Sequence, residues 1–141
     1  MTREEIAALF ARRQEAWTRR DAASLAADHV ADGEVHSPLA GGAVHTRAEI
    51  EKLYQAYFVA FPDLVLQHDD VLIDGERVAV FARASGTDRG GFMGLAPTGR
   101  TVKLSVAMFY HLRDGQIARE WRVYDFTGLL VQVGALKAKP I

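Results

Sequence analysis

The first sixty residues place their apolar side chains with the period of an α-helix. One face of the first segment carries five side chains at helical spacing: Ile6, Leu9, Phe10, Arg13 and Trp17. This pattern predicts an amphipathic helix whose apolar face is interrupted only by the arginine. The sequence TREE at its start is typical of a capping box, in which Thr2 accepts from a backbone amide three residues on and Glu5 reaches back.

Two further helices are expected before Pro62. The sequence RRDAASLAADHV predicts a turn and a short helix capped by Asp21. A second capping-box sequence, TRAE at residues 46–49, precedes the strongest helical pattern of the chain. Its apolar positions follow the spacing i, i+3, i+4, i+7, i+8 and i+11: Ile50, Leu53, Tyr54, Tyr57, Phe58 and Phe61. Because proline disfavours a helical conformation in the residue before it, this helix should end at Pro62.

Beyond Pro62 the apolar period becomes that of a β-strand. Four segments follow it: LVLQHDDVLI, RVAVFARASGT, TVKLSVAMFYHL and QIAREWRVYD. The dipeptides Asp-Gly at residues 74–75 and 114–115 should join them into two hairpins, since glycine accepts the positive φ of a primed turn. The glycine-rich sequence DRGGFMGLAPTGR could lie across the mouth of a pocket. The sequence FTGLLVQVG predicts a short last helix that stops at Gly134.

This order of elements predicts an α+β fold. Three helices followed by a strand meander favour a curved, mostly antiparallel sheet wrapped around the N-terminal helices. No internal repeat, low-complexity tract or linker divides the chain, so we expect one domain over residues 1–141. With 49% hydrophobic residues in 141, such a domain can bury a sizeable core.

Composition narrows the classes of partner. Lys and Arg number 17 and Asp and Glu 18, and no basic stripe stands out, which argues against a nucleic acid or an anionic membrane. No apolar run approaches the ~20 residues that span a bilayer, and the charged N-terminus lacks the apolar core of a signal peptide. Cysteine is absent, which excludes disulfides and thiolate metal sites, and the five histidines lack metal-ligand spacing. We therefore expect a cytoplasmic protein without a metal.

The second predicted hairpin singles out Asp125. A two-residue turn at Asp114-Gly115 would pair Met108 with Trp121 and Leu104 with Asp125, on the apolar face that turns toward the helices. Asp125 would be the only acid on that face. Since a buried, uncompensated charge costs several kcal/mol, the carboxyl would have to be paired, solvated in a cavity or neutral, and a carboxyl in apolar surroundings is prepared to exchange protons.

Three interpretations of Asp125 remain open. It could be the acid of a pocket, it could cap the last helix by accepting from backbone amides, or it could belong to a structural ion pair. The first two roles do not exclude each other.

Other polar residues have competing interpretations. His36 points to the opposite face of a regular strand and is either a pocket residue or a surface or interface histidine. His111 lies on the outer face unless a bulged turn brings it toward Asp125 as a polarising partner. Arg83 could bind an anionic oxygen. Because arginine is rarely buried, the alternative is a solvated charge at an edge or interface without a role in a site. The remaining candidates for the wall or lid of a cavity are large apolar side chains: Trp17, Tyr54, Phe58, Phe61, Phe92, Met93, Met108 and Trp121.

Four segments resemble one known family. The phrases VAFPDLVL, ASGTDRGGFMGLAPTGRTV, FYHLRDGQIAREWRVYD and TGLLVQVG are similar in order and spacing to the SnoaL-like polyketide cyclases of the nuclear-transport-factor-2-like superfamily. The resemblance covers nearly the whole chain. It implies a cone-shaped fold with an interior pocket, a homodimer, no cofactor, and a catalytic aspartate at position 125. Ser37 stands where these cyclases often have a pocket asparagine; serine still donates and accepts hydrogen bonds, but it is shorter.

The resemblance implies cofactor-independent acid/base catalysis of an intramolecular aldol ring closure, with a small apolar or aromatic carbonyl compound as the substrate. Related members of the same fold act as hydroxylases or isomerases. A domain of this shape can also be a non-catalytic small-molecule-binding module, since a fold does not determine a function. These three alternatives are the functional hypotheses that the sequence supports.

Overall fold

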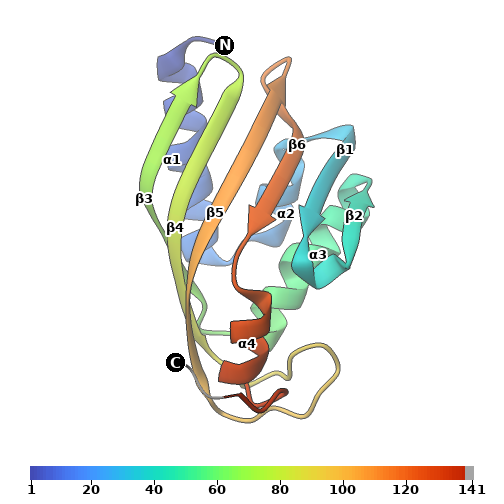
Figure 1. Ribbon diagram of the computed structural model, residues 1–141. Helices are drawn as coiled ribbons and strands as arrows, with labels where there is room; N and C mark the ends of the chain where they lie inside the picture. The colour runs from blue at the N-terminus through green and yellow to red at the C-terminus, as the bar shows by residue number, and fades with distance from the viewer. Residues whose placement is uncertain (139–141) are drawn as a thin grey trace.

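The computed structural model describes residues 1–138 (Figure 1). Its elements follow the expected order except that two strands stand between the second and third helices. The helices are α1 (Arg3–Arg19), α2 (Ala22–Ala27), α3 (Arg47–Ala60) and α4 (Phe126–Gln132), with a short 3-10 turn, η1 (Pro38–Ala40). The strands are β1 (His29–Ser37), β2 (Gly42–His45), β3 (Val65–Asp74), β4 (Arg77–Thr87), β5 (Thr101–Arg113) and β6 (Gln116–Val123).

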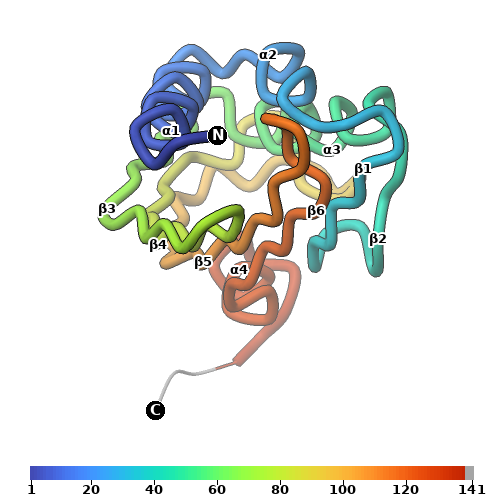
Figure 2. Tube along the Cα trace, turned by 90° about the horizontal axis from the view of Figure 1, so that it is seen from above, coloured from blue at the N-terminus to red at the C-terminus, as the bar shows by residue number. Residues whose placement is uncertain are grey.

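The six strands form one curved, open sheet in the order β2-β1-β6-β5-β4-β3. Neighbouring strands are antiparallel except β1 and β6, which run parallel. Helices α1, α2 and α3 lie along one face of the sheet, and α4 lies at the end of the sheet where β6 stops (Figures 1 and 2). The expected α+β architecture, a curved sheet around N-terminal helices, is confirmed.

The predicted helix starts are confirmed by their hydrogen bonds. The Thr2 hydroxyl accepts from the backbone amide of Glu5 at 3.1 Å, and the Glu5 carboxylate accepts from the amide of Thr2 at 3.3 Å. Asp21 caps α2 through the amide of Ser24 at 3.0 Å, and Thr46 accepts from Glu49 at the start of α3. Each side chain thus supplies an acceptor for an amide that the first helical turn leaves unpaired.

The hairpin between β5 and β6 has the predicted turn but not the predicted register. Asp114 and Gly115 have φ values of 51° and 78° and join Arg113 to its partner Gln116, as a primed turn requires. The pair Leu112 and Ile117 follows in register. His111 then pairs with Arg119, so Ala118 has no partner and forms a bulge in β6.

This bulge exchanges the two faces of β6. Met108 lies opposite Arg122 rather than Trp121, and Glu120 and Arg122 turn toward the helices and are buried. Val123, expected on the inner face, is 65% exposed. The predicted inward face of Trp121, Val123 and Asp125 is therefore wrong, because one extra residue reverses the side of every later side chain.

The core fills the space between the inner face of the sheet and the helices. Its fully buried members come from every layer: Leu25, Val35, Ile50, Tyr54, Val78, Val80, Tyr110 and Ile117. Within residues 1–138, no helix combines the length and apolar character that crossing a membrane requires.

A histidine on β3 gives the folded state a pH dependence. The Nε2 atom of His68 is buried and has no hydrogen-bond partner among the described residues. Burial, together with the charge of Arg13, lowers the pKa of His68 from 6.5 to about 4. Between these two values the unfolded chain binds a proton that the folded chain does not, so stability must fall as the pH falls through this window.

We expect the wild type to lose about 1–2 kcal/mol of unfolding free energy through His68 between pH 6.5 and 4, a figure reduced for partial solvent screening of this half-buried ring. His68→Gln should flatten the curve of unfolding free energy against pH in that window, measured by urea denaturation. His45→Gln, at an exposed position, should leave the slope as it is. Equal slopes for wild type and His68→Gln would contradict the assignment.

Candidate functional site

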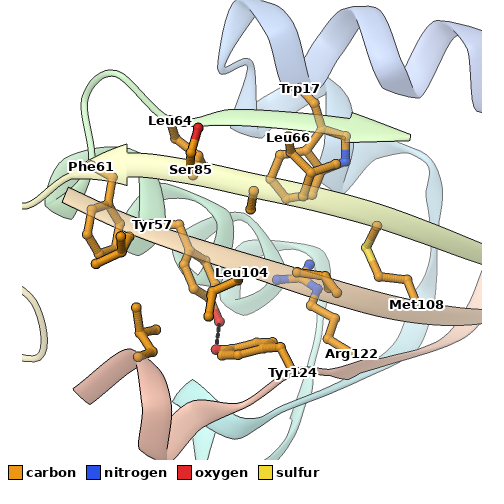
Figure 3. Close-up of a pocket in the computed structure, with 14 residues that line it drawn as sticks. Trp17, Tyr57, Phe61, Leu64, Leu66, Ser85, Leu104, Met108, Arg122 and Tyr124 are labelled. Carbon is orange, nitrogen blue, oxygen red and sulfur yellow. Dashed lines mark hydrogen bonds between the residues drawn. The ribbon is translucent and has the colours of Figure 1, made fainter. Parts of the chain in front are cut away.

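An apolar hollow lies between the inner face of the sheet, α1, α3 and α4 (Figure 3). Its cavity volume is about 50 Å³, within about 550 Å³ of space between the atoms that is partly open to solvent. The hollow is therefore narrow, and its lining suits apolar groups. Its lining residues are Trp17, Tyr57, Phe61, Leu64, Leu66, Ala84, Ser85, Val102, Leu104, Val106, Met108, Arg122, Tyr124 and Leu129.

Arg122 is the only ionised side chain among these lining residues. The side chain is 4% exposed, and its guanidinium lies over the ring of Tyr54, 4.5 Å from the ring centroid. Its Nε pairs with the carboxylate of Glu120. Its Nη1 and Nη2 atoms are buried and have no hydrogen-bond partner in the described part of the chain.

Behind the hollow, Glu120 is the centre of a buried polar cluster. Its Oε1 accepts from the Tyr54 hydroxyl at 3.1 Å and lies 3.2 Å from Nε2 of His29, while Oε2 pairs with Arg122. Arg13 lies 3.8 Å from the same carboxylate. The four partners come from α1, α3, β1 and β6, so the cluster ties the helices to the sheet.

The surrounding charges decide the state of Glu120. Burial by itself would raise the pKa of Glu120, but the charge of Arg122, the hydrogen bond and charge of His29, and the charge of Arg13 outweigh burial and hold the pKa well below its ordinary value. Glu120 therefore stays ionised at neutral pH. It anchors the cluster and is not suited to exchange protons with a substrate.

Hydroxyl groups form a second polar feature at the wall. The Tyr57 hydroxyl lies 3.0 Å from that of Ser37. It lies 2.5 Å from the hydroxyl of Tyr124 (Figure 3). Three hydroxyl protons serve two hydrogen bonds, so one proton is left for another acceptor. Burial and the neighbouring Tyr57 raise the pKa of Tyr124, which keeps this phenol protonated at neutral pH.

Some of the predicted pocket residues meet at the hollow. Trp17, Phe61 and Met108 line it. Tyr54 is fully buried behind it in the Glu120 cluster, and Phe58 packs edge-on against Trp17. Ser37 is buried and touches the wall through the Tyr57 hydroxyl.

Asp125 is exposed and lies outside this lining. It is the N-cap of α4, and its Oδ1 accepts from the backbone amide of Gly128 at 2.8 Å. It directly follows Tyr124, whose ring lines the hollow. The cap proposed from the sequence is confirmed, and the expected position on the inner face is not.

Five other candidates lie away from the hollow. Trp121 stacks on His36 with ring centroids 5.3 Å apart, and both lie on the outer face of the sheet with His111. The exposed side chain of Arg83 forms two hydrogen bonds to the carboxylate of Asp69, both 2.8 Å long. Met93 is 54% exposed on the glycine-rich loop.

Phe92 belongs to the core and not to an open lid. It is 1% exposed and lies between the rings of Phe61 and Phe126, with centroids 5.7 Å and 6.2 Å away. Phe92 therefore packs in the core next to Phe61, which lines the hollow, and is not itself part of the lining.

The polar residues of the site escaped prediction for two reasons. Arg122 and Glu120 fall on the outer face of an unbulged β6, and the sequence of that strand gives no signal for the bulge at Ala118. Arg13 does give a signal, because a charge on the apolar face of a helix requires a buried partner. That partner, Glu120, lies more than one hundred residues away in the chain and cannot be named from the pattern.

Metal binding finds little support in the arrangement of ligating side chains. In residues 1–138, no group of three or more histidine, aspartate or glutamate side chains is placed to hold a metal ion. The polar groups of the lining, a guanidinium, two phenols, a serine hydroxyl and an indole, are also unlike those of a metal site.

Several solved structures have the same fold as this chain. Solved structures with this fold include AclR from Streptomyces galilaeus, described as a proposed hydroxylase, which is 29% identical, covers 99% of this chain and 87% of its own, and has a TM-score of 0.84. IdmH from Streptomyces antibioticus, described as a proposed polyketide cyclase, is also 29% identical, with 93% and 96% covered and a TM-score of 0.71. TsrD from Streptomyces laurentii, at 21% identity, 96% and 99% coverage and a TM-score of 0.83, shares the fold.

No curated protein is similar enough to this chain to count as a relative. The sequence model of the SnoaL-like polyketide cyclases, in contrast, matches residues 7–133, which include most of α1, every element from α2 to α4 and all the residues of the hollow. This chain belongs to the SnoaL-like polyketide cyclase family.

Proposed function

We propose that the chain is a cofactor-independent enzyme of the polyketide cyclase type, which closes a ring in a flat carbonyl compound by an intramolecular aldol reaction. The observation that carries this proposal is the narrow apolar hollow with polar groups on one part of its wall, in a chain of this family. Such a hollow holds a substrate in one folded conformation, and orientation of this kind supplies a large part of the barrier reduction for a ring closure.

The proposed chemistry uses only proton transfers. Asp125, adjacent to the wall residue Tyr124, removes a proton from the carbon next to one carbonyl. The resulting enolate carbon attacks a second carbonyl of the same molecule, and a new carbon–carbon bond forms. The alkoxide so produced takes up the proton held by Asp125 or one from the Tyr124 phenol, which stays protonated at neutral pH.

Turnover of an aromatic polyketide ester tests this proposal. The purified chain, without added cofactor, should convert an uncyclised β-keto ester of an anthraquinone into its ring-closed isomer, followed by absorbance and mass spectrometry. The product has the mass of the substrate, because an aldol addition only rearranges bonds. A product heavier by one oxygen would instead assign the chain to hydroxylation, the activity proposed for AclR.

A second candidate function is the binding of an apolar metabolite without chemistry. The exposure of Asp125 and its role as the cap of α4 favour this candidate, because a cap requires no catalytic role. A chain that binds the ester tightly and returns it unchanged would be such a binding module.

We also propose that the outer face of the sheet pairs with a second copy of the chain, as the family resemblance implies. Phe81 and Phe109 are 55% and 39% exposed there, and Trp121 and Val123 adjoin them across paired strands. A contiguous apolar surface of this kind is typical of a protein interface.

Sedimentation should therefore give a mass twice the 15.5 kDa of the chain. Phe109→Glu, which places a charge in the middle of this surface, should reduce the mass to that of a monomer at micromolar concentration. Val59→Glu, at an exposed apolar position on α3, is the matched control and should stay dimeric. A monomeric wild type would exclude the dimer.

A further inference from the structure

Two residues that line the hollow carry buried hydrogen-bond donors that have no partner in the described structure. Nη1 and Nη2 of Arg122 and Nε1 of Trp17 are all buried without partners, and both residues line the same hollow. A buried donor without an acceptor costs about 1–3 kcal/mol, and more when it is charged. A ligand that brings acceptor atoms to these donors would remove this cost.

The carboxylate beside Arg122 is already committed. Both oxygens of Glu120 have partners, Oε2 in the pair with Nε of Arg122 and Oε1 with Tyr54 and His29. No Asp or Glu side chain belongs to the described lining of the hollow. The two terminal nitrogens of Arg122 thus lie buried at the wall of a hollow whose described lining has no acidic side chain.

The guanidinium of Arg122 is held in place by its neighbours, which orients it before any ligand binds. Its Nε is fixed by Glu120, its guanidinium plane lies against the Tyr54 ring, and Tyr57 lies 6.0 Å from the same group. A held guanidinium offers two parallel N–H groups, which match two oxygen atoms that share one negative charge. Most of the remaining lining is apolar, and a lower local dielectric strengthens such a pair.

From this geometry we infer that the hollow contains an anion subsite, formed by Arg122 and assisted by Trp17, for a flat apolar compound with two adjacent oxygens sharing one negative charge. A carboxylate and the enolate of a 1,3-dicarbonyl both have this chemistry. The inference deepens the proposed function and rests on the same hollow. It makes Arg122 the residue that selects the ionised form of the ligand.

Binding of matched pairs of probes tests the subsite by isothermal titration calorimetry. The carboxylate pair is 2-naphthoate and its methyl ester, and the enolate pair is 2-hydroxy-1,4-naphthoquinone and its methyl ether. In at least one pair the anion should bind the wild type about tenfold to hundredfold more tightly than the methylated compound, the range expected for a hydrogen-bonded charge. The pair with the larger ratio identifies which anion the subsite takes.

Variants of Arg122 and Trp17 assign the effect to these residues. Arg122→Met should remove the preference for the anion and leave binding of the methylated compound within about twofold, and Trp17→Phe should reduce the preference by about threefold. Arg83→Met, which removes an exposed arginine that pairs with Asp69 outside the hollow, is the matched control and should bind as the wild type does. Arg122→Met leaves Glu120 underpaired, so the double variant Glu120→Gln/Arg122→Met repeats the test if the single variant does not fold.

The inference is overturned if the wild type binds the anion and the methylated compound equally in both pairs. It is also overturned if the preference for the anion survives in Arg122→Met or in the double variant. The outcome is independent of catalysis. If the chain prefers the anion but converts no polyketide ester, the subsite is supported and the proposed enzymatic function is excluded. If it converts the ester without any preference for the anion, the enzymatic function is supported and the subsite is excluded.

Discussion

Glu120→Gln should destabilise the protein by about 3–5 kcal/mol, the cost of removing one partner from a buried ion pair. The carboxylate faces the guanidinium groups of Arg122 and Arg13, whose side chains are almost or fully buried. Glutamine keeps the size of the side chain but leaves Arg122 without its counter-charge in an apolar environment. Urea denaturation at pH 7 should show the loss as a lower midpoint with an unchanged m-value.

Two controls separate this effect from the loss of a surface charge. Glu34→Gln removes a carboxylate that pairs with His36 and Arg119 at the surface, and its effect should stay within about 0.5 kcal/mol. Glu120→Gln/Arg122→Met removes both charges of the inner pair and should recover a large part of the loss. An effect of Glu120→Gln as small as that of Glu34→Gln would show that the cluster does not hold the helices to the sheet.

The same carboxylate should make the protein sensitive to acid. The pKa of Glu120 is lower in the folded than in the unfolded chain, so its contribution is complete above the unfolded value of about 4.3 and is lost as the pH falls below it toward the folded pKa. The His68 contribution is lost at higher pH, between 6.5 and about 4. Acid unfolding of the wild type therefore has two separable parts, and Glu120→Gln should lack the lower one.

Much of the fold was predictable because its signals are local. The caps at Thr2, Asp21 and Thr46 depend on residues three positions away, and the turn at Asp114-Gly115 depends on the conformational freedom of glycine. The change from helical to strand periodicity after Pro62 also lies within one segment. Such patterns can be recognised without knowledge of the tertiary structure.

The site was harder to predict because it depends on one bulge and on partners distant in the sequence. The predicted register of β5 and β6 is correct at the pair Leu112 and Ile117 and wrong from Arg119 onward. The extra residue, Ala118, decides whether Trp121 or Arg122 faces the hollow. Local propensity does not place a bulge. The charged residues Glu120 and Arg122, which suit an exposed strand face by type, are stabilised inside only by each other and by Arg13, His29 and Tyr54.

Asp125→Asn should lower the turnover of a polyketide ester at least a hundredfold, the effect expected when a general base is removed. Asparagine caps a helix about as well as aspartate does, so the bond to the Gly128 amide and the start of α4 should be kept. The substitution thus separates the two roles that the sequence left open for this residue. Turnover and the unfolding free energy should be measured on the same preparation, and we expect the first to fall and the second to stay within about 0.5 kcal/mol.

Asp125→Ala completes the comparison, because it removes both the carboxylate and the cap. It should lose turnover to the same extent as Asp125→Asn and, in addition, about 1 kcal/mol of stability. If Asp125→Asn turns over substrate as fast as the wild type while Asp125→Ala is only less stable, Asp125 is a cap alone, and any acid/base chemistry belongs to another group. The hydroxyl chain of Ser37, Tyr57 and Tyr124 would then be the next candidate, since it lies at the wall of the hollow and has one proton to donate.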